Sequence, residues 1–383
     1  MKLRYGLVGG GNGGFIGGVH RRAADFDFAC ELSAGCFSRK QEANLQTGTL
    51  WGVTPERTYS SFQEMAEAEG NREDGVDFIS IATPNFTHYE IAKTFLEHGI
   101  HVICDKPVAL DSVQAEELCS LAEERGLLFG VCYTYANYAI LQEARRMIRV
   151  GMLGELFSIV AEYPQDWILT PDDTDVMSDW LMDPEKTGKA GCTAHIGTHL
   201  EYLMRYVTGA KPRRILARFQ TYPRNLPLET ESQVMIDYEN QIQGLMWASI
   251  AAAGNDCGIA LRVFGSRGSL EWSHLNPSRL IYHPLNQPSQ TLVCGRNYLG
   301  EEAGRLARLP AGHPEGFYEA FANIFRNFCG DLKLLKEGRR PEELHFPTIE
   351  DGLLSMRFIE ACVESDKKGN IWVEINRPEM TPE

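Results

Sequence analysis

Positive charge is scarce in this sequence, and long apolar runs are absent from it. Its 37 lysines and arginines are outnumbered by 52 aspartates and glutamates, which gives a formal net charge of −15 when the histidines are neutral. Nucleic acids and anionic membranes bind positively charged surfaces, so the composition argues against both as partners. A membrane-spanning helix needs about 18 or more consecutive apolar residues, and no stretch approaches that length. We therefore expect no nucleic-acid partner and no membrane segment.

The ten cysteines lack the spacings of a metal site or of a redox motif. No CxxC occurs, and most cysteines lie within apolar runs, as Cys104 does in HVICD. The first residues also lack the apolar core of a secretory signal. Because free cysteines are among the most buried residues, we expect reduced, packed thiols, no metal, and a cytoplasmic protein.

Strand and helix patterns alternate over the first third of the chain. Apolar runs at residues 3–8, 28–37, 76–82, 101–104 and 127–133 predict five strands. Thr87 and Asp111 each have Glu or Gln three residues later, a capping pattern that predicts helix starts between the strands. The alternation predicts an α/β fold, with a doubly wound parallel sheet in a Rossmann domain at residues 1–132.

The pattern changes beyond about residue 150, where strand-like runs follow one another with few helices between them. These runs lie at residues 155–163, 213–222, 232–238, 242–252, 259–264, 269–272 and 280–283. They predict a second, α+β domain at residues 133–383 with a large open, mainly antiparallel sheet. Helices are predicted at 195–207, 315–336 and 349–367, and the last is a candidate to pack back on the first domain.

Glycines follow the first predicted strand and precede a predicted helix. Gly9, Gly11 and Gly14 fit the GxGxxG fingerprint of dinucleotide-binding folds, with Asn12 inside the loop. The first glycine permits a tight turn, the second lets a pyrophosphate approach the backbone, and the third allows close helix packing. The alternative is a glycine-rich turn without a ligand.

The end of the second predicted strand lacks the carboxylate that would bind an NAD ribose. Ser38, Arg39 and Lys40 occupy this region and offer a hydroxyl and two cations. Since cations would neutralise a 2′-phosphate, the sequence favours NADP over NAD. Alternatively, Arg39 and Lys40 belong to a solvated loop.

Two further motifs carry a family resemblance. Thr83, Pro84, Asn85 and His88 form an ATPNxxH pattern after the third strand, and Asp105-Lys106-Pro107 follows the fourth. With these motifs the chain resembles the family of glucose–fructose oxidoreductase, inositol dehydrogenase and MocA (Gfo/Idh/MocA), in which the second motif reads E-K-P. The resemblance implies that Thr83, Pro84, Asn85, His88 and Asp105 bind the cofactor. It also implies that Lys106 lies near the nicotinamide and transfers the substrate proton.

The middle of the chain departs from the family pattern. His199 matches the histidine of the family's DxGxH pattern, which implies a substrate or catalytic role, whereas His195 stands where an aspartate is usual. At helical spacing the two rings would share a face and bind substrate hydroxyls. No third ligand is evident, which argues against zinc. The alternative for each is a histidine packed in the core.

Aromatic and amide side chains mark a candidate substrate region. Tyr135 and Asn137 lie where family members present residues to the substrate, and Trp167 lies in a polar segment interpreted as a loop or lid. Such side chains suit a sugar-like ring, because they offer apolar faces together with hydrogen bonds. A packing seam between domains is the alternative.

Together these features predict an NAD(P)-dependent dehydrogenase acting on a secondary hydroxyl of a sugar, sugar derivative or inositol. The alternatives are a non-catalytic dinucleotide-binding regulator and an NAD-assisted glycoside hydrolase. The resemblance also implies a homodimer or homotetramer formed through the open face of the second sheet. We expect four residues to make that face apolar: Val234, Ile236, Leu245 and Trp247.

Overall fold

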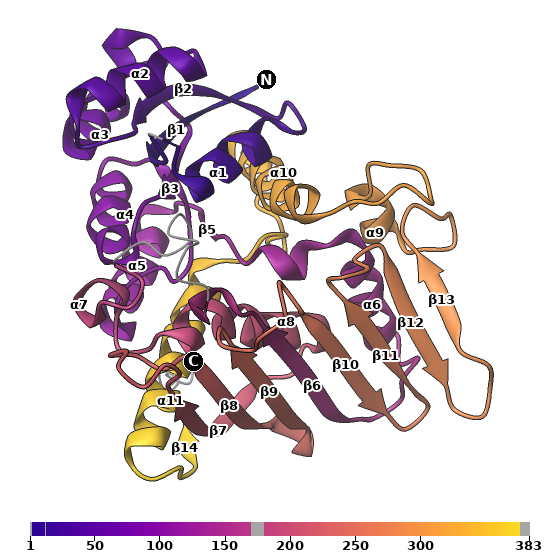
Figure 1. Ribbon diagram of the computed structural model, residues 1–383. Coiled ribbons are helices and arrows are strands. Elements are labelled where there is room, and N and C mark those ends of the chain that lie inside the picture. The colour runs from indigo at the N-terminus through magenta and orange to yellow at the C-terminus, as the bar shows by residue number, and fades with distance from the viewer. Residues whose placement is uncertain (1, 12, 170–179, 376–383) are drawn as a thin grey trace. The chain divides into compact units, whose positions relative to one another are not determined.

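The computed structural model describes residues 2–11, 13–169 and 180–375, which form two compact units (Figure 1). The first unit comprises Met1–Thr134 and Phe317–Leu354, and the second comprises Tyr135–Gly316 and Ser355–Glu383. The sequence placed all residues from 133 onward in one domain, whereas residues 317–354 pack with the first unit. The predicted helix at 349–367 therefore begins in one unit and continues into the other.

The first unit contains a five-stranded parallel sheet with the order β2-β1-β3-β4-β5. The strands are β1 (Leu3–Gly9), β2 (Cys30–Cys36), β3 (Phe78–Ala82), β4 (His101–Cys104) and β5 (Phe129–Val131). The chain leaves β1 toward β2 on one side and toward β3 on the other, so the strand order reverses there. This reversal is the switch point at which doubly wound sheets bind ligands, and the predicted Rossmann fold is confirmed.

Five helices connect these strands. They are α1 (Phe15–Asp25), α2 (Gln41–Trp51), α3 (Phe62–Gly70), α4 (His88–Glu97) and α5 (Ser112–Arg125). Side chains cap α3 and α5, where Ser61 accepts from the Glu64 N–H and Asp111 accepts from the Gln114 N–H. Helix α2 begins after Lys40 without a side-chain cap, and the sequence analysis did not predict it.

Helix α10 (Phe317–Lys336) completes the core of the first unit. It runs beside α1 (Figure 1), and Phe321, Phe325 and Phe328 are buried in one apolar cluster with Tyr5 and Phe78. These aromatic rings remove a large apolar area from water. The sequence did not indicate that α10 packs with the first unit, because the helix follows the strands of the second unit along the chain.

The second unit contains a nine-stranded sheet with the order β13-β12-β11-β10-β6-β9-β8-β7-β14 (Figure 1). Its strands are β6 (Leu156–Pro164), β7 (Pro212–Gln220), β8 (Glu231–Tyr238), β9 (Gln243–Ser249), β10 (Ala260–Gly265), β11 (Gly268–Ser273), β12 (Arg279–Pro284), β13 (Gln290–Val293) and β14 (Val373–Glu374). Only the β6–β9 pair is parallel among the described strand pairs of this sheet. The predicted open, mainly antiparallel sheet is confirmed.

The helices of the second unit include α6 (Ala139–Arg149), α7 (Pro184–Thr187), α8 (Thr198–Thr208), α9 (Glu301–Leu306) and most of α11 (Ile349–Lys367). No helix in the described part of the chain is both long and apolar enough to cross a membrane.

The two faces of the nine-stranded sheet differ in exposure. Val234 and Ile236 are fully buried, on the face where Met246 reaches the helical segment at Gly197. Met235 and Leu245 pair on the opposite face and are 47% and 50% exposed. Strand side chains alternate between faces, so the expectation that Val234 and Ile236 line the open face is wrong. Leu245 does line it, together with Met235 and the partly exposed Trp247.

Candidate active site

The glycine loop after β1 lies so close to neighbouring backbone atoms that side chains would not fit at Gly9 and Gly11. Gly9 and Gly10 have φ angles of +93° and +76°. A Cβ atom on Gly9 would lie 2.5 Å from the Ala82 carbonyl oxygen, and one on Gly11 would lie 2.6 Å from the Phe37 carbonyl oxygen. The Gly11 N–H donates to that Phe37 oxygen at 3.0 Å. The loop therefore lies directly against the residues that follow β2 and β3.

The start of α1 is suited to an anion. Its N-cap residue is Gly14, no side chain caps it, and its first turn contains no acidic residue. The first N–H groups of a helix lack partners within the helix, and they attract phosphate groups together with the helix dipole. A bare loop followed by an uncapped helix fits a dinucleotide pyrophosphate. Asn12 lies outside the described residues.

The loop after β2 places two cations near the region expected for the adenosine ribose. Asn44 anchors this loop, because its Oδ1 accepts from the Phe37 N–H at 2.7 Å and from the Ser38 N–H at 3.3 Å. The Ser38 hydroxyl accepts from the Lys40 N–H at 3.2 Å. Arg39 and Lys40 are both exposed. The arrangement can accommodate either a ribose hydroxyl or a phosphate.

The loop after β3 carries the ATPNxxH motif. Thr83 and Pro84 follow the strand, and Asn85 begins a short 3₁₀ turn, η2 (Asn85–Thr87), in which its side chain is buried. The Thr87 hydroxyl donates to the Thr83 hydroxyl at 2.7 Å. His88 is fully buried, with ring nitrogens on the backbone carbonyls of Thr83 and Pro107. The sequence placed His88 among the cofactor contacts, whereas its ring binds the protein's own loops.

Lys106 follows β4 at the same edge of the sheet as the glycine loop, since all five strands are parallel. The Asp105 N–H donates to the Ile81 carbonyl at 3.0 Å, and the Lys106 N–H donates to the Asp105 carboxylate at 2.8 Å. Desolvation lowers the pKa of the Lys106 amine, and the negative charge of Asp105 opposes this effect. A lowered pKa makes the neutral amine available as a base.

His195 and His199 lie in the second unit on consecutive helical segments. His195 belongs to a π-helical turn, η5 (Thr193–Gly197), and His199 lies in the first turn of α8. The sequence predicted one continuous helix from 195, but α8 begins at Thr198. Such π turns are rare in proteins, and those that occur are often found at functional sites.

The Glu229 carboxylate holds the start of this segment. It is buried and accepts from the Gly191 N–H at 2.7 Å and from the Thr193 N–H at 2.9 Å. The Glu229 carbonyl accepts from the Cys192 N–H at 2.9 Å. The turn that carries His195 is therefore fixed by a residue just before β8, which the sequence analysis missed.

An aromatic cluster lies on one side of His199. Its ring packs edge-on against Tyr135 at 4.8 Å between centroids. The hydroxyl groups of Tyr135 and Tyr163 lie 2.8 Å apart, and the Cys257 thiol donates to Tyr163 at 3.4 Å. The His274 ring contacts Tyr135 at 5.3 Å. Tyr163, Cys257 and His274 come from distant parts of the sequence, which explains why sequence analysis did not group them.

A hydrogen-bonded chain connects this cluster to Trp167. The Trp167 indole donates to Gln165 at 3.1 Å, and the Gln165 amide donates to the Tyr163 hydroxyl at 3.2 Å. Trp167 also packs edge-on against His195 at 5.9 Å. The spacing of residues 163, 165 and 167 is typical of one face of an extended segment, and this signal could have revealed Gln165 and Tyr163.

The remaining predicted substrate residue, Asn137, is buried at the end of a 3₁₀ turn, η3 (Thr134–Asn137). Four of the acidic residues in the polar segment interpreted as a lid lie outside the described residues. Within the described ranges, no group of three or more His, Cys, Asp or Glu residues is arranged to hold a metal ion.

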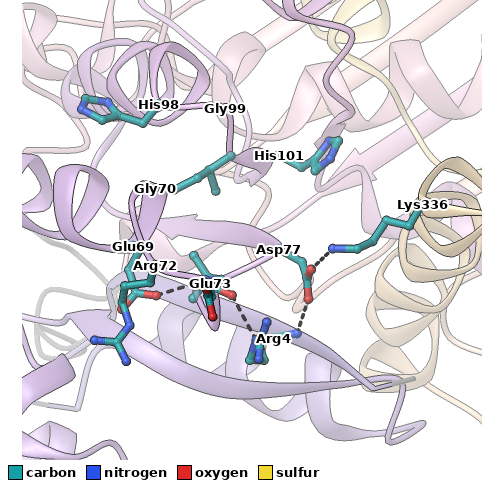
Figure 2. Close-up of a pocket in the computed structure, with 13 residues that line it drawn as sticks. Arg4, Glu69, Gly70, Arg72, Glu73, Asp77, His98, Gly99, His101 and Lys336 are labelled. Atoms are coloured by element: carbon teal, nitrogen blue, oxygen red, sulfur yellow. Dashed lines mark hydrogen bonds and ion pairs between the residues drawn. The ribbon is translucent and has the colours of Figure 1, made fainter.

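A pocket at the opposite edge of the first unit is not the cofactor site (Figure 2). Arg4, Asp77 and His101 line it at or beside the amino ends of β1, β3 and β4, together with Lys336. Asp77 accepts from the Arg4 N–H at 2.6 Å and forms an ion pair with Lys336. Ligands of doubly wound sheets bind at the carboxyl ends of the strands, so this pocket lies at the wrong edge.

Comparisons with known proteins agree with the fold. Residues 3–133 match the family model described as "Oxidoreductase family, NAD-binding Rossmann fold", and residues 141–271 match the "GFO/IDH/MocA C-terminal domain". An uncharacterized oxidoreductase of Bacillus subtilis, YfiI, is 36% identical over 97% of this chain and 96% of its own.

Solved structures are similar over nearly the whole chain. An inositol dehydrogenase homolog from Azotobacter vinelandii, complexed with NAD⁺, is 33% identical with a TM-score of 0.93, over 98% of this chain and 97% of that one. A structure of the homolog complexed with NADH and myo-inositol is 33% identical with a TM-score of 0.90, over 98% of both chains. The chain belongs to the Gfo/Idh/MocA family of NAD-binding oxidoreductases.

Proposed function

We propose that this protein is an NAD(P)-dependent dehydrogenase that transfers a hydride between the nicotinamide and a secondary hydroxyl or ketone of a sugar, sugar derivative or inositol. One observation carries the proposal. Lys106, whose amine has a lowered pKa, follows β4 at the same edge of the sheet as the glycine loop. The chain's family membership supports the same reaction, as does its similarity to the homolog that was crystallised with NADH and myo-inositol.

The chain's own residues supply binding and proton transfer. Gly9, Gly11 and Gly14 cradle the pyrophosphate, and when bound the nicotinamide accepts or donates the hydride. Lys106 takes the proton of the substrate hydroxyl as the carbinol hydride leaves, and it returns the proton in the reverse reaction. We assign His199 to assist this proton transfer.

We assign the substrate ring to the cluster of the second unit. His195, His199 and Tyr135 offer hydrogen bonds, and Trp167 offers an apolar face, which together suit a polyol ring. Asn137 contributes an amide at the same turn as Tyr135. His195 takes the place of an aspartate in the family pattern and makes this site less negative.

The exposed Arg39 and Lys40 support a preference for NADP over NAD, because no carboxylate occurs in residues 37–40 to bind a free ribose 2′-hydroxyl. The exposed Met235 and Leu245 support a homodimer or homotetramer formed through the open face of the sheet.

The experiment combines thermal shift and turnover. The protein loaded with NAD or NADP is screened against inositols, hexoses, sugar acids and anhydrosugars, since a productive ligand stabilises it by mass action. Hits are then assayed for NAD(P)H formation. Stabilisation without any turnover would favour a regulator. In a parallel assay with a chromogenic glycoside, release of the aglycone without net NAD(P)H formation would favour a glycoside hydrolase.

A further inference from the structure

His88 joins two loops at the carboxyl edge of the parallel sheet. Its Nδ1 lies 2.7 Å from the Pro107 carbonyl oxygen, and its Nε2 lies 2.7 Å from the Thr83 carbonyl oxygen. Thr83 follows β3 and Pro107 follows β4, and these two strands are neighbours in the sheet. The ring is fully buried, so one rigid side chain spans the distance between the two loops.

The Lys106 backbone is held on both sides by these contacts. On one side the Asp105 N–H donates to the Ile81 carbonyl of β3 at 3.0 Å. On the other side the carbonyl of the next residue, Pro107, bonds to His88. The Asp105 carboxylate also accepts from the Lys106 N–H at 2.8 Å. Of these contacts, the one through His88 connects the Lys106 segment to the loop after β3.

We propose that His88 is a positioning residue that fixes the Lys106 amine relative to the loop after β3. This inference rests on the proposed function only for the use of that amine in catalysis. Neither ring nitrogen is available to bind a cofactor, because both are engaged by the protein's own backbone. It acts through the Pro107 and Thr83 carbonyls.

The charge of Lys106 is one of the influences on the ionisation of His88. A neutral imidazole donates to only one of the two carbonyls, whereas an imidazolium donates to both. Burial lowers the pKa of His88, while the two carbonyls and the charge of Asp105 oppose this effect. Lys106 and His20 are the other titratable groups that interact with the ring. Because His88 holds the segment that carries Lys106, its replacement should change the desolvation of the amine and therefore its titration.

The first test measures Lys106 without any enzyme assay. Acetic anhydride labelling of Lys106, followed across pH by peptide mass spectrometry, gives the midpoint at which the amine becomes reactive. We expect His88→Ala to raise this midpoint by roughly 0.5 unit or more, because a loosened loop would let water reach the amine and reduce the desolvation that lowers its pKa. His88→Gln keeps one donor group and should give a smaller rise.

His98→Gln is the matched control. His98 lies just beyond the same helix, is exposed, and places its Nδ1 2.7 Å from the Thr94 carbonyl oxygen. Its replacement should leave the labelling profile unchanged. An unchanged profile in both His88 variants would overturn the proposal.

The second test separates positioning from cofactor binding. We expect His88→Ala to lower kcat about tenfold or more, since a small displacement of a catalytic group is costly, and to leave the Kd for NAD(P) within about threefold. An equal loss in Kd would make His88 a cofactor residue and contradict the proposal. If His88→Ala does not fold, His88→Gln decides the question. A wild type with no turnover on any polyol would refute the proposed function, while the labelling result would still decide the role of His88.

Discussion

At the scale of single residues, the Lys106 amine is the group on which the proposed chemistry depends. Lys106→Ala should lower kcat by about 10²-fold or more, the usual scale for a lost acid–base group, with the Kd for NAD(P) nearly unchanged. Steady-state kinetics and a cofactor titration measure both quantities. Lys93→Ala is the control, because Lys93 lies on α4 and pairs with Glu117 at 2.6 Å. Wild-type turnover in the Lys106 variant would exclude this mechanism.

Arg39 tests the cofactor preference at the same scale. Its replacement by alanine should weaken NADP binding about ten- to a hundredfold and barely change NAD binding, because only NADP carries a phosphate on that ribose. Isothermal titration with both cofactors measures the difference. Equal losses for NAD and NADP, or a wild type that strongly prefers NAD, would contradict the NADP preference.

The sequence made some site residues visible and hid others for physical reasons. Gly9 and Gly11 lie in a contiguous glycine motif, so their spacing pointed to them, whereas Lys106 was identified through the resemblance of its motif to the family pattern. Tyr163 and Cys257 meet only because β6 and the segment before β10 lie side by side in the sheet. His88 lies in a recognised motif, but its burial and carbonyl partners are properties of the folded chain.

At the scale of elements, the π turn that carries His195 depends on Glu229. Glu229→Gln should lower the free energy of unfolding by about 1–3 kcal/mol. The glutamine oxygen can still accept from one N–H group, but its NH₂ group is a donor and cannot accept from the second. Urea unfolding measures the change.

The matched control for that variant is Glu231→Gln. Glu231 is partly exposed and accepts from the Gln233 side chain at 3.0 Å. Its loss should cost much less stability. Equal effects at both positions would show that Glu229 does not hold the turn.

Helices and strands with capping residues or apolar periodicity could be predicted from the sequence. Features that depend on contacts with residues distant in the sequence could not. The uncapped α2 was missed, and the helix predicted from 195 is interrupted by a π turn whose partner, Glu229, is distant in sequence. Helix α10 was predicted as a helix but placed in the wrong unit. Its phenylalanines pack against β1 and β3, and a helix sequence does not specify its partner.

At the scale of the whole molecule, the buried His20 and the partly buried His101 make stability depend on pH. Burial lowers the pKa of His20 and of His101 to about 4. Between about pH 6.5 and pH 4 the unfolded chain binds protons that the folded chain does not. The contribution of these histidines to the free energy of unfolding is therefore fully present above about pH 6.5. It decreases as the pH falls, by up to about 3 kcal/mol for each histidine.

His20→Gln tests this dependence. The His20 Nδ1 lies 2.7 Å from the Ser80 hydroxyl, so the variant should be less stable at pH 7 but should lose less stability on acidification. Urea unfolding between pH 4.5 and 7.5 measures both slopes. Parallel curves for the variant and the wild type would show that His20 does not contribute.

Direct hydride transfer is the central claim, and one isotope measurement tests it. The protein is incubated with NAD or NADP and with carbon-deuterated myo-inositol or glucose, and the nicotinamide is examined by NMR. We expect deuterium at C4 of the reduced nicotinamide with at least one of these substrates, and none with Lys106→Ala on the same timescale. Substrate consumption without deuterium on the nicotinamide would contradict the account.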